Sequence, residues 1–222
     1  MDYTADVRQE IEKWGDKPIQ SITIRRAPVL AWIEKFFSLI TAGQWNTVKQ
    51  KYGYDKFYHL SLILTYATAP TKTDTVTMNF LVDDTMPQRS EGIKVIVEKL
   101  ALVNVGRNLD TKPNSEYMPV DMRGRVITLG QMLERTRRLM GDQAFFTYDA
   151  FSNNCQVFVK NLLSSQHLLT KEAYEFLFQP IDKLIKELPS YTSKVAKFVT
   201  NLGGIMTGVV NGYKPTGSYI RA

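Results

Sequence analysis

The chain of 222 residues contains a single cysteine, Cys155, and this count limits how the fold can be held together. One cysteine excludes an internal disulfide framework and any zinc cluster built from several thiolates. The fold must therefore be stabilised by a buried apolar core. A chain of this length with 44% hydrophobic residues can build such a core as one domain with an appendage.

Cys155 lies where a helix is expected to begin. Asn153 and Asn154 are favourable N-cap residues, and apolar residues recur behind them at helical spacing. A thiol in the first turn of a helix faces unpaired backbone N–H groups and the positive end of the helix dipole, which favour the thiolate. Because the thiolate is the nucleophilic form, Cys155 is a candidate nucleophile. A lone cysteine is also commonly a small buried hydrophobe, and the helix start alone does not separate these interpretations.

A cysteine nucleophile needs a base, and the chain has two histidines, His59 and His167. His59 lies in residues 55–64, which are rich in aromatic and apolar side chains and are predicted to form a strand. A strand can hold a histidine rigidly, as general base catalysis requires. A core histidine bonded to a backbone carbonyl would show the same pattern. His167 follows the cysteine helix in a polar turn and is predicted to be exposed.

The cysteine motif resembles that of a known family. A helix ending at Gly141 leads through Tyr148 to Asn154-Cys155-Gln156-Val157-Phe158-Val159. This arrangement is similar to the lecithin:retinol acyltransferase-like proteins, which are circularly permuted members of the NlpC/P60 papain-like superfamily. In that family a strand histidine precedes the cysteine in the chain, and Tyr58-His59-Leu60 fills that place here. The resemblance covers roughly residues 54 to 163.

The resemblance implies a fold and a chemistry. The expected fold is α+β and circularly permuted papain-like, with a small antiparallel sheet packed against helices and an α-helical C-terminal extension. The expected activity is attack of Cys155 on an ester or amide carbonyl, with His59 as the base. Substrates of this kind are lipid or peptide acyl groups, and neither a metal nor an organic cofactor is needed.

Two departures from the family pattern concern the site. The family carries a second histidine on the next strand, and Asn79, within residues 75–82, takes that position here. An asparagine carbonyl can accept the imidazole N–H, so Cys155, His59 and Asn79 form a candidate catalytic set. Asn79 is equally explained as a polar residue on a solvent-facing side. The acidic residue and histidine that follow the family cysteine are replaced by Gln156 and Val157, which leaves the substrate class open.

The organisation of the chain follows from apolar periodicity and helix caps. We predict three parts: an N-terminal strand and buried helix in residues 1–50, a permuted papain-like core in 51–168, and a helical C-terminal extension in 169–222. Helices are predicted over residues 3–15, 28–41, 128–141, 155–163, 170–180 and 181–188. Strands are predicted over residues 20–25, 55–64, 75–82 and 93–98, and residues 100–105 extend or follow the last of them. Residues 106–124 are predicted to be a loop.

An apolar stripe distinguishes residues 191–211 within the extension. Its glycines allow another backbone to approach closely, and its lysine and asparagine residues argue against a membrane-spanning helix. The segment is therefore predicted to pack on a membrane surface, on a protein assembly or back on its own domain.

The net charge of +6 and the pI of about 9.3 favour acidic partners. The basic residues are scattered and carry no nucleic-acid-binding signature, so no specific nucleic acid is expected. The N-terminus lacks the pattern of a secretory signal, and no apolar run has membrane length. These features predict an intracellular location, in the cytoplasm, at a membrane surface or in a virion.

Two classes of function follow. The first is a thiol-dependent acyl hydrolase or acyltransferase. The second is a non-catalytic structural or interaction module of the same fold, for example in a viral capsid or a membrane-attached assembly, because one fold can host either function. An open cleft beside Cys155 would favour the enzyme, and a filled one would favour the module.

Overall fold

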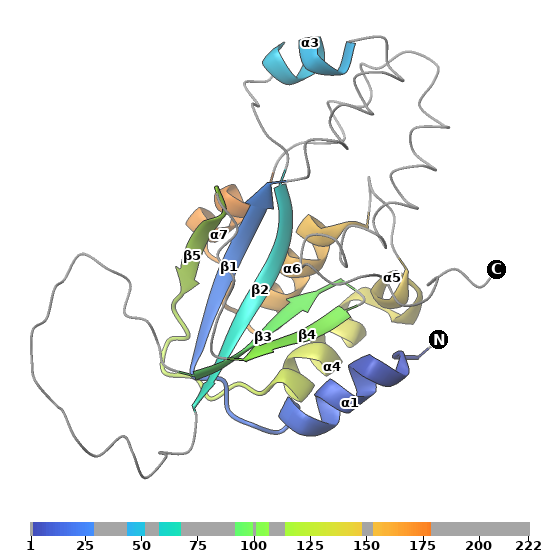
Figure 1. The fold of residues 1–222 in the computed structure, drawn as a ribbon, viewed down its shortest axis with the longest axis vertical. Coiled ribbons are helices and arrows are strands. Elements are labelled where there is room, and N and C mark those ends of the chain that lie inside the picture. Colours follow the sequence, from blue (N-terminus) through green and yellow to red (C-terminus); the bar gives the residue numbers. More distant parts are fainter. Residues whose placement is uncertain are drawn as a thin grey trace, which may run out of the picture.

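The structure is a computed structural model, and it has the α+β architecture that the sequence predicts. Its strands form one antiparallel five-stranded sheet in the order β4-β3-β2-β1-β5. Figure 1 shows this sheet with most of the labelled helices on one side of it. The residues that the structure describes are 2–28, 44–51, 58–67, 92–99, 101–106, 114–147 and 153–178.

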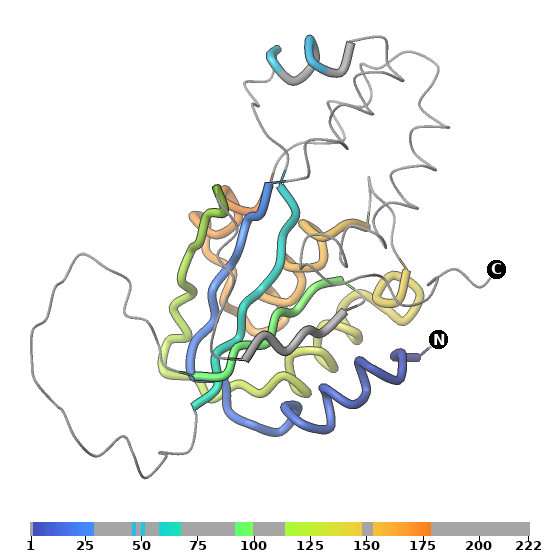
Figure 2. Tube along the Cα trace, viewed as in Figure 1, coloured from blue at the N-terminus to red at the C-terminus, as the bar shows by residue number. Residues whose placement is uncertain are grey.

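The strands are β1 (Ser21–Pro28), β2 (Tyr58–Ala67), β3 (Gly92–Glu98), β4 (Ala101–Gly106) and β5 (Glu116–Val120). The helices are α1 (Ala5–Trp14), α3 (Gln44–Lys51), α4 (Leu129–Met140), α5 (Asp142–Phe146), α6 (Cys155–Ser165) and α7 (Lys171–Leu177). Helix α6 packs on β2, α7 packs against β5, and α4 contacts both α1 and α6. Strands β1 and β2 run side by side through the middle of the sheet (Figure 2).

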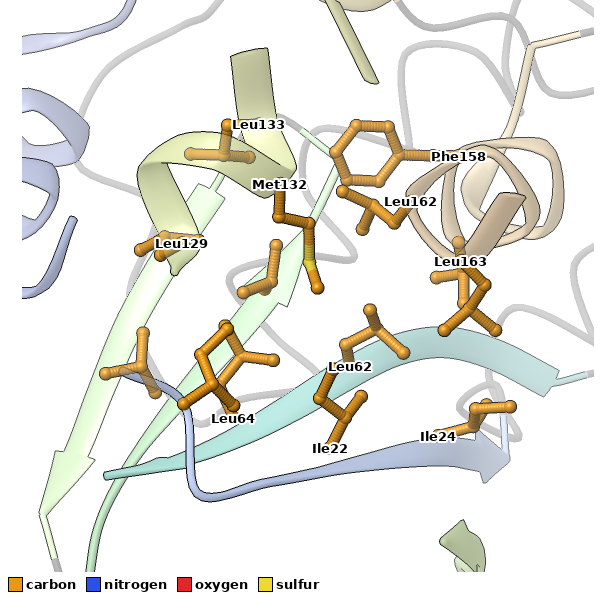
Figure 3. Close-up of a cluster of buried hydrophobic side chains, with 14 of the residues drawn as sticks. Ile22, Ile24, Leu62, Leu64, Leu129, Met132, Leu133, Phe158, Leu162 and Leu163 are labelled. Atoms are coloured by element: carbon orange, nitrogen blue, oxygen red, sulfur yellow. The ribbon is translucent and has the colours of Figure 1, made fainter. Parts of the chain in front are cut away.

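The core lies between the sheet and helices α4 and α6. Alternate residues of β1 and β2 face these helices, as the strand period of two requires. Figure 3 shows their side chains pointing toward those of the helices. The apolar residues at the centre of this cluster are almost completely buried: Ile22, Ile24, Leu62, Leu64, Leu129, Met132, Leu133, Phe158, Leu162 and Leu163.

Side-chain caps set where the helices begin. Thr128 accepts a hydrogen bond from the Gln131 N–H at the start of α4, and Thr170 accepts one from the Ala173 N–H at the start of α7. These bonds satisfy amides that have no partner within the helix. The helix predicted over 128–141 is confirmed, as is the strand predicted over 93–98.

The structure corrects parts of two predicted elements. Pro28 is the last residue of β1 and pairs with Tyr58, so a helix does not begin at Pro28 itself, and the rest of the helix predicted over 28–41 lies outside the described residues. Residues 106–124 are not only a loop, because β5 lies within them and pairs with β1. Pro119 of β5 lacks an N–H, and the strand tolerates it because β5 is at the edge of the sheet.

The predicted boundary at residue 50 is also not a boundary between folding units. Strand β1 is hydrogen-bonded on one side to β2 and on the other to β5. An inner strand cannot leave the sheet without breaking two ladders, so β1 belongs to the same unit as β2 to β5. The strand predicted over 75–82 and the predicted C-terminal helices, including 191–211, lie outside the described residues.

Candidate functional site

Cys155 is the first residue of α6, as predicted. Asn154 caps the helix, and its Oδ1 accepts hydrogen bonds from the Gln156 N–H at 3.0 Å and the Val157 N–H at 3.2 Å. This cap holds the first turn in place, and the backbone N–H of Cys155 does not donate to it. The Cys155 thiol is free, and the residue is 6% exposed. The sulfur is therefore at the positive end of the helix dipole and almost closed to solvent.

His59 is the second residue of β2 and lies beside that sulfur. It pairs with Ala27 of β1, so the backbone of an inner strand fixes its position. Its side chain is 5% exposed and interacts with the Cys155 side chain, which raises the pKa of the ring. A thiol at the start of a helix and an imidazole on a strand thus meet across 96 positions of the chain, since one residue is 59 and the other 155.

A carboxylate that the sequence analysis did not select, that of Glu98, faces His59. Its Oε1 lies 3.1 Å from His59 Nε2, and its side chain is fully buried. The distance is that of an ion pair. Glu98 ends β3, and its position on the sheet therefore depends on the pairing of β3 with β2.

Arg25 supports the same carboxylate from β1. Its Nη2 lies 3.4 Å from Glu98 Oε1, and its Nε donates to Ser61 Oγ at 3.1 Å. Strand pairing explains why these side chains lie close together. Arg25 of β1 is directly opposite Ser61 of β2, and Glu98 follows Val97 of β3, which is opposite Leu62 of β2. Arg25, Ser61 and Glu98 therefore occupy neighbouring positions on three central strands, and all three are buried.

This network sets the protonation of His59. Burial by itself disfavours the charged ring, but the Glu98 carboxylate and the contact with Cys155 outweigh it and raise the pKa of His59 from 6.5 to about 10. The ring is accordingly an imidazolium at neutral pH. An imidazolium in contact with a sulfur favours the thiolate, which is the arrangement of a nucleophilic cysteine.

A second cation, Lys99, is buried next to the site. It lies in the tight turn between β3 and β4, since Glu98 and Ala101 are paired around it. Burial lowers the pKa of Lys99 to about 8, although the charge on Cys155 acts in the opposite direction. Lys99 was not selected in the sequence analysis either.

The structure thus brings together two of the three predicted site residues. Cys155 and His59 are in contact, whereas Asn79 lies outside the described residues and its predicted role stays a prediction. His167 is exposed, as predicted, and lies apart from the pair at the far end of α6. A signal for Glu98 was present in the sequence, because the charged residues Glu98 and Lys99 directly follow the apolar run Val95-Ile96-Val97.

Across the described ranges, no three His, Cys, Asp or Glu side chains are grouped so that they could hold a metal ion. In the same ranges, no helix is both long and apolar enough to cross a membrane. No protein-family model, no curated protein and no solved structure matches the chain.

Proposed function

We propose that the protein is a thiol-dependent acyl hydrolase or acyltransferase with a circularly permuted papain-like fold. Cys155 is the nucleophile, His59 is the acid and base, and Glu98 positions and charges the imidazole. The observation that carries this proposal is the contact of the Cys155 thiol with a buried histidine that also contacts a carboxylate. The order of histidine before cysteine along the chain is that of the permuted family.

The reaction needs only groups that this cluster contains. The Cys155 sulfur attacks the carbonyl carbon of an ester or amide and forms a C–S bond, while the bond from that carbon to the leaving oxygen or nitrogen breaks. His59 gives its proton to the leaving group. Water or an acceptor alcohol then attacks the thioester, His59 takes its proton, and the C–S bond breaks to restore the thiolate.

The negative charge on the carbonyl oxygen requires a donor in the first turn of α6. The Gln156 and Val157 amides already donate to Asn154 Oδ1. The backbone N–H of Cys155 is the first-turn amide that this cap does not use. We assign it the role of oxyanion donor.

The substrate class follows from the chemistry of a thiolate nucleophile and is an activated acyl group, from a lipid or a peptide. The scattered positive charge and the single reduced thiol support an intracellular setting, in the cytoplasm, at a membrane surface or in a virion. A membrane or protein assembly contacted through residues 191–211 is part of the same proposal.

One observation favours the second class of function, a non-catalytic module of this fold. Cys155 is 6% exposed and His59 is 5% exposed, so neither reactive atom faces open solvent. In an enzyme the substrate has to reach the sulfur, which requires the site to open. In a structural module the same buried charges would only fix the fold.

Acylation of Cys155 separates the two functions. The protein is incubated with p-nitrophenyl esters of acetate, butyrate and decanoate, with an acyl-peptide thioester, and with phosphatidylcholine vesicles, and the mass of the Cys155 peptide is then measured. We expect an added acyl group in the wild type and in His167→Gln, which changes the exposed histidine. We expect none in Cys155→Ser and a loss of at least tenfold in His59→Gln. Equal acylation of wild type and His59→Gln, or none with any donor, would exclude the enzyme and leave the module.

A further inference from the structure

Lys99 is a buried amine that the proposed mechanism does not use. It is 2% exposed, although a lysine is almost never fully buried unless its charge is compensated. Its Nζ donates to the carbonyl oxygen of Ala144 at 2.9 Å and lies 3.5 Å from that of Phe145. Two carbonyls of α5 thus fix the amine but bring no formal negative charge.

The same amine faces the helix that carries Cys155. Lys99 Nζ lies 5.2 Å from the centre of the Phe158 ring, and Phe158 is one helical turn beyond Cys155 on α6. The ring face is electron-rich and attracts a cation. Lys99 is therefore held between α5 and the first turn of α6, the helix that begins with Cys155.

The charged groups near Lys99 show which of them can compensate its positive charge. Glu98 of β3 is shared by His59 of β2 and Arg25 of β1, which contact the same carboxylate oxygen. Among the described residues, the opposite charge that acts on Lys99 is that of Cys155. We propose that Lys99 is a second positioning cation of this site, and that its ammonium stabilises the thiolate of Cys155 in addition to the His59–Glu98 pair.

This inference rests on the proposed nucleophilic role of Cys155 and adds a regulation of that site by pH. The pKa of Lys99 is about 8 and that of His59 is about 10, so Lys99 loses its proton first as the pH rises. Between these values the sulfur keeps its imidazolium partner but loses the ammonium. The influence of Lys99 on the sulfur should therefore be present at pH 6 to 7.5 and absent above pH 9.

Alkylation of Cys155 by iodoacetamide tests the inference without any acyl substrate. The sulfur displaces iodide, and the rate follows the thiolate fraction. The rate is measured from pH 5.5 to 9.5 for wild type, Lys99→Met, Lys99→Arg and Lys160→Met. Methionine keeps most of the apolar stem of lysine, arginine keeps the charge, and Lys160 is a partly exposed lysine of the same helix α6 that serves as the matched control.

We expect Lys99→Met to be roughly three- to thirtyfold slower than wild type at pH 6.5 and equal to it above pH 9. Lys99→Arg and Lys160→Met should stay within twofold of wild type throughout. Wild-type rates for Lys99→Met at pH 6.5, with urea unfolding showing that it is folded, would overturn the inference, as would a deficit that persists above pH 9. Failure of Cys155 acylation with a normal Lys99 effect would instead remove the proposed enzyme and keep the electrostatic coupling.

Discussion

The charge of Glu98 is expected to decide whether His59 is protonated. Glu98→Gln keeps the size of the side chain but removes the carboxylate that lies 3.1 Å from the ring. The network raises the pKa of His59 from 6.5 to about 10, and Glu98 is the largest favourable influence. At about 1.4 kcal/mol per pH unit, this pKa shift corresponds to a net stabilisation of the charged ring over the neutral ring on the order of 5 kcal/mol.

The variant leaves burial as the dominant influence on the ring, and burial lowers a histidine pKa. We expect the midpoint of the His59 titration to fall by at least two pH units, to below pH 8. The assay is NMR observation of the histidine ring protons from pH 5 to 11. The chain has only two histidines, so His167 provides the reference signal in each spectrum. A His59 midpoint within half a unit of the wild-type value would refute the reasoning.

The same variant should unfold more easily, because Arg25 and His59 would both lose the charge they share. Removal of one partner from a buried ion pair costs about 3–5 kcal/mol. The measurement is urea unfolding at pH 6, where the ring is charged. The control is Glu134→Gln, which removes an exposed carboxylate paired with Arg138 and should cost at most about 1 kcal/mol. Equal losses for the two variants would contradict a buried role for Glu98.

Three further outcomes are expected from the packing, the cap and the charges. Asn154→Ala should lower the free energy of unfolding by about 0.5–2 kcal/mol, because two first-turn amides lose their acceptor, and a urea midpoint unchanged from wild type would count against the cap. Leu162→Ala should cost about 2–5 kcal/mol in the same assay because its side chain is fully buried, whereas Leu139→Ala, at a residue 56% exposed on α4, should cost far less. In a Cys155→Ser background, which has no thiol, stability should fall as the pH rises from 6.5 to 8, because the folded His59 keeps a proton that the unfolded chain releases. The free energy of unfolding should fall by at most about 1.4 kcal/mol per pH unit, and the additional substitution His59→Gln should make this dependence on pH weaker.

Local features of the sequence were sufficient for the parts of the site that depend on neighbours along the chain. Asn154, Cys155 and the apolar spacing behind them specify a capped helix start within one or two turns, and the structure has that helix. The apolar run around His59 likewise specifies a strand, and β2 is there. Caps and periodicity act over a few residues, so they can be read without knowing the rest of the fold.

Only the tertiary structure decided which charges meet. Arg25 and Glu98 are 73 positions apart, and they come together because the register of three strands places them in one row. Strand β5 and the end of β1 at Pro28 were missed for the same reason, since an edge strand and the length of an inner strand depend on a partner rather than on the segment itself. The sequence thus determined a helix-start thiol and a strand histidine, while long-range strand pairing decided that Glu98, Arg25 and Lys99 surround them.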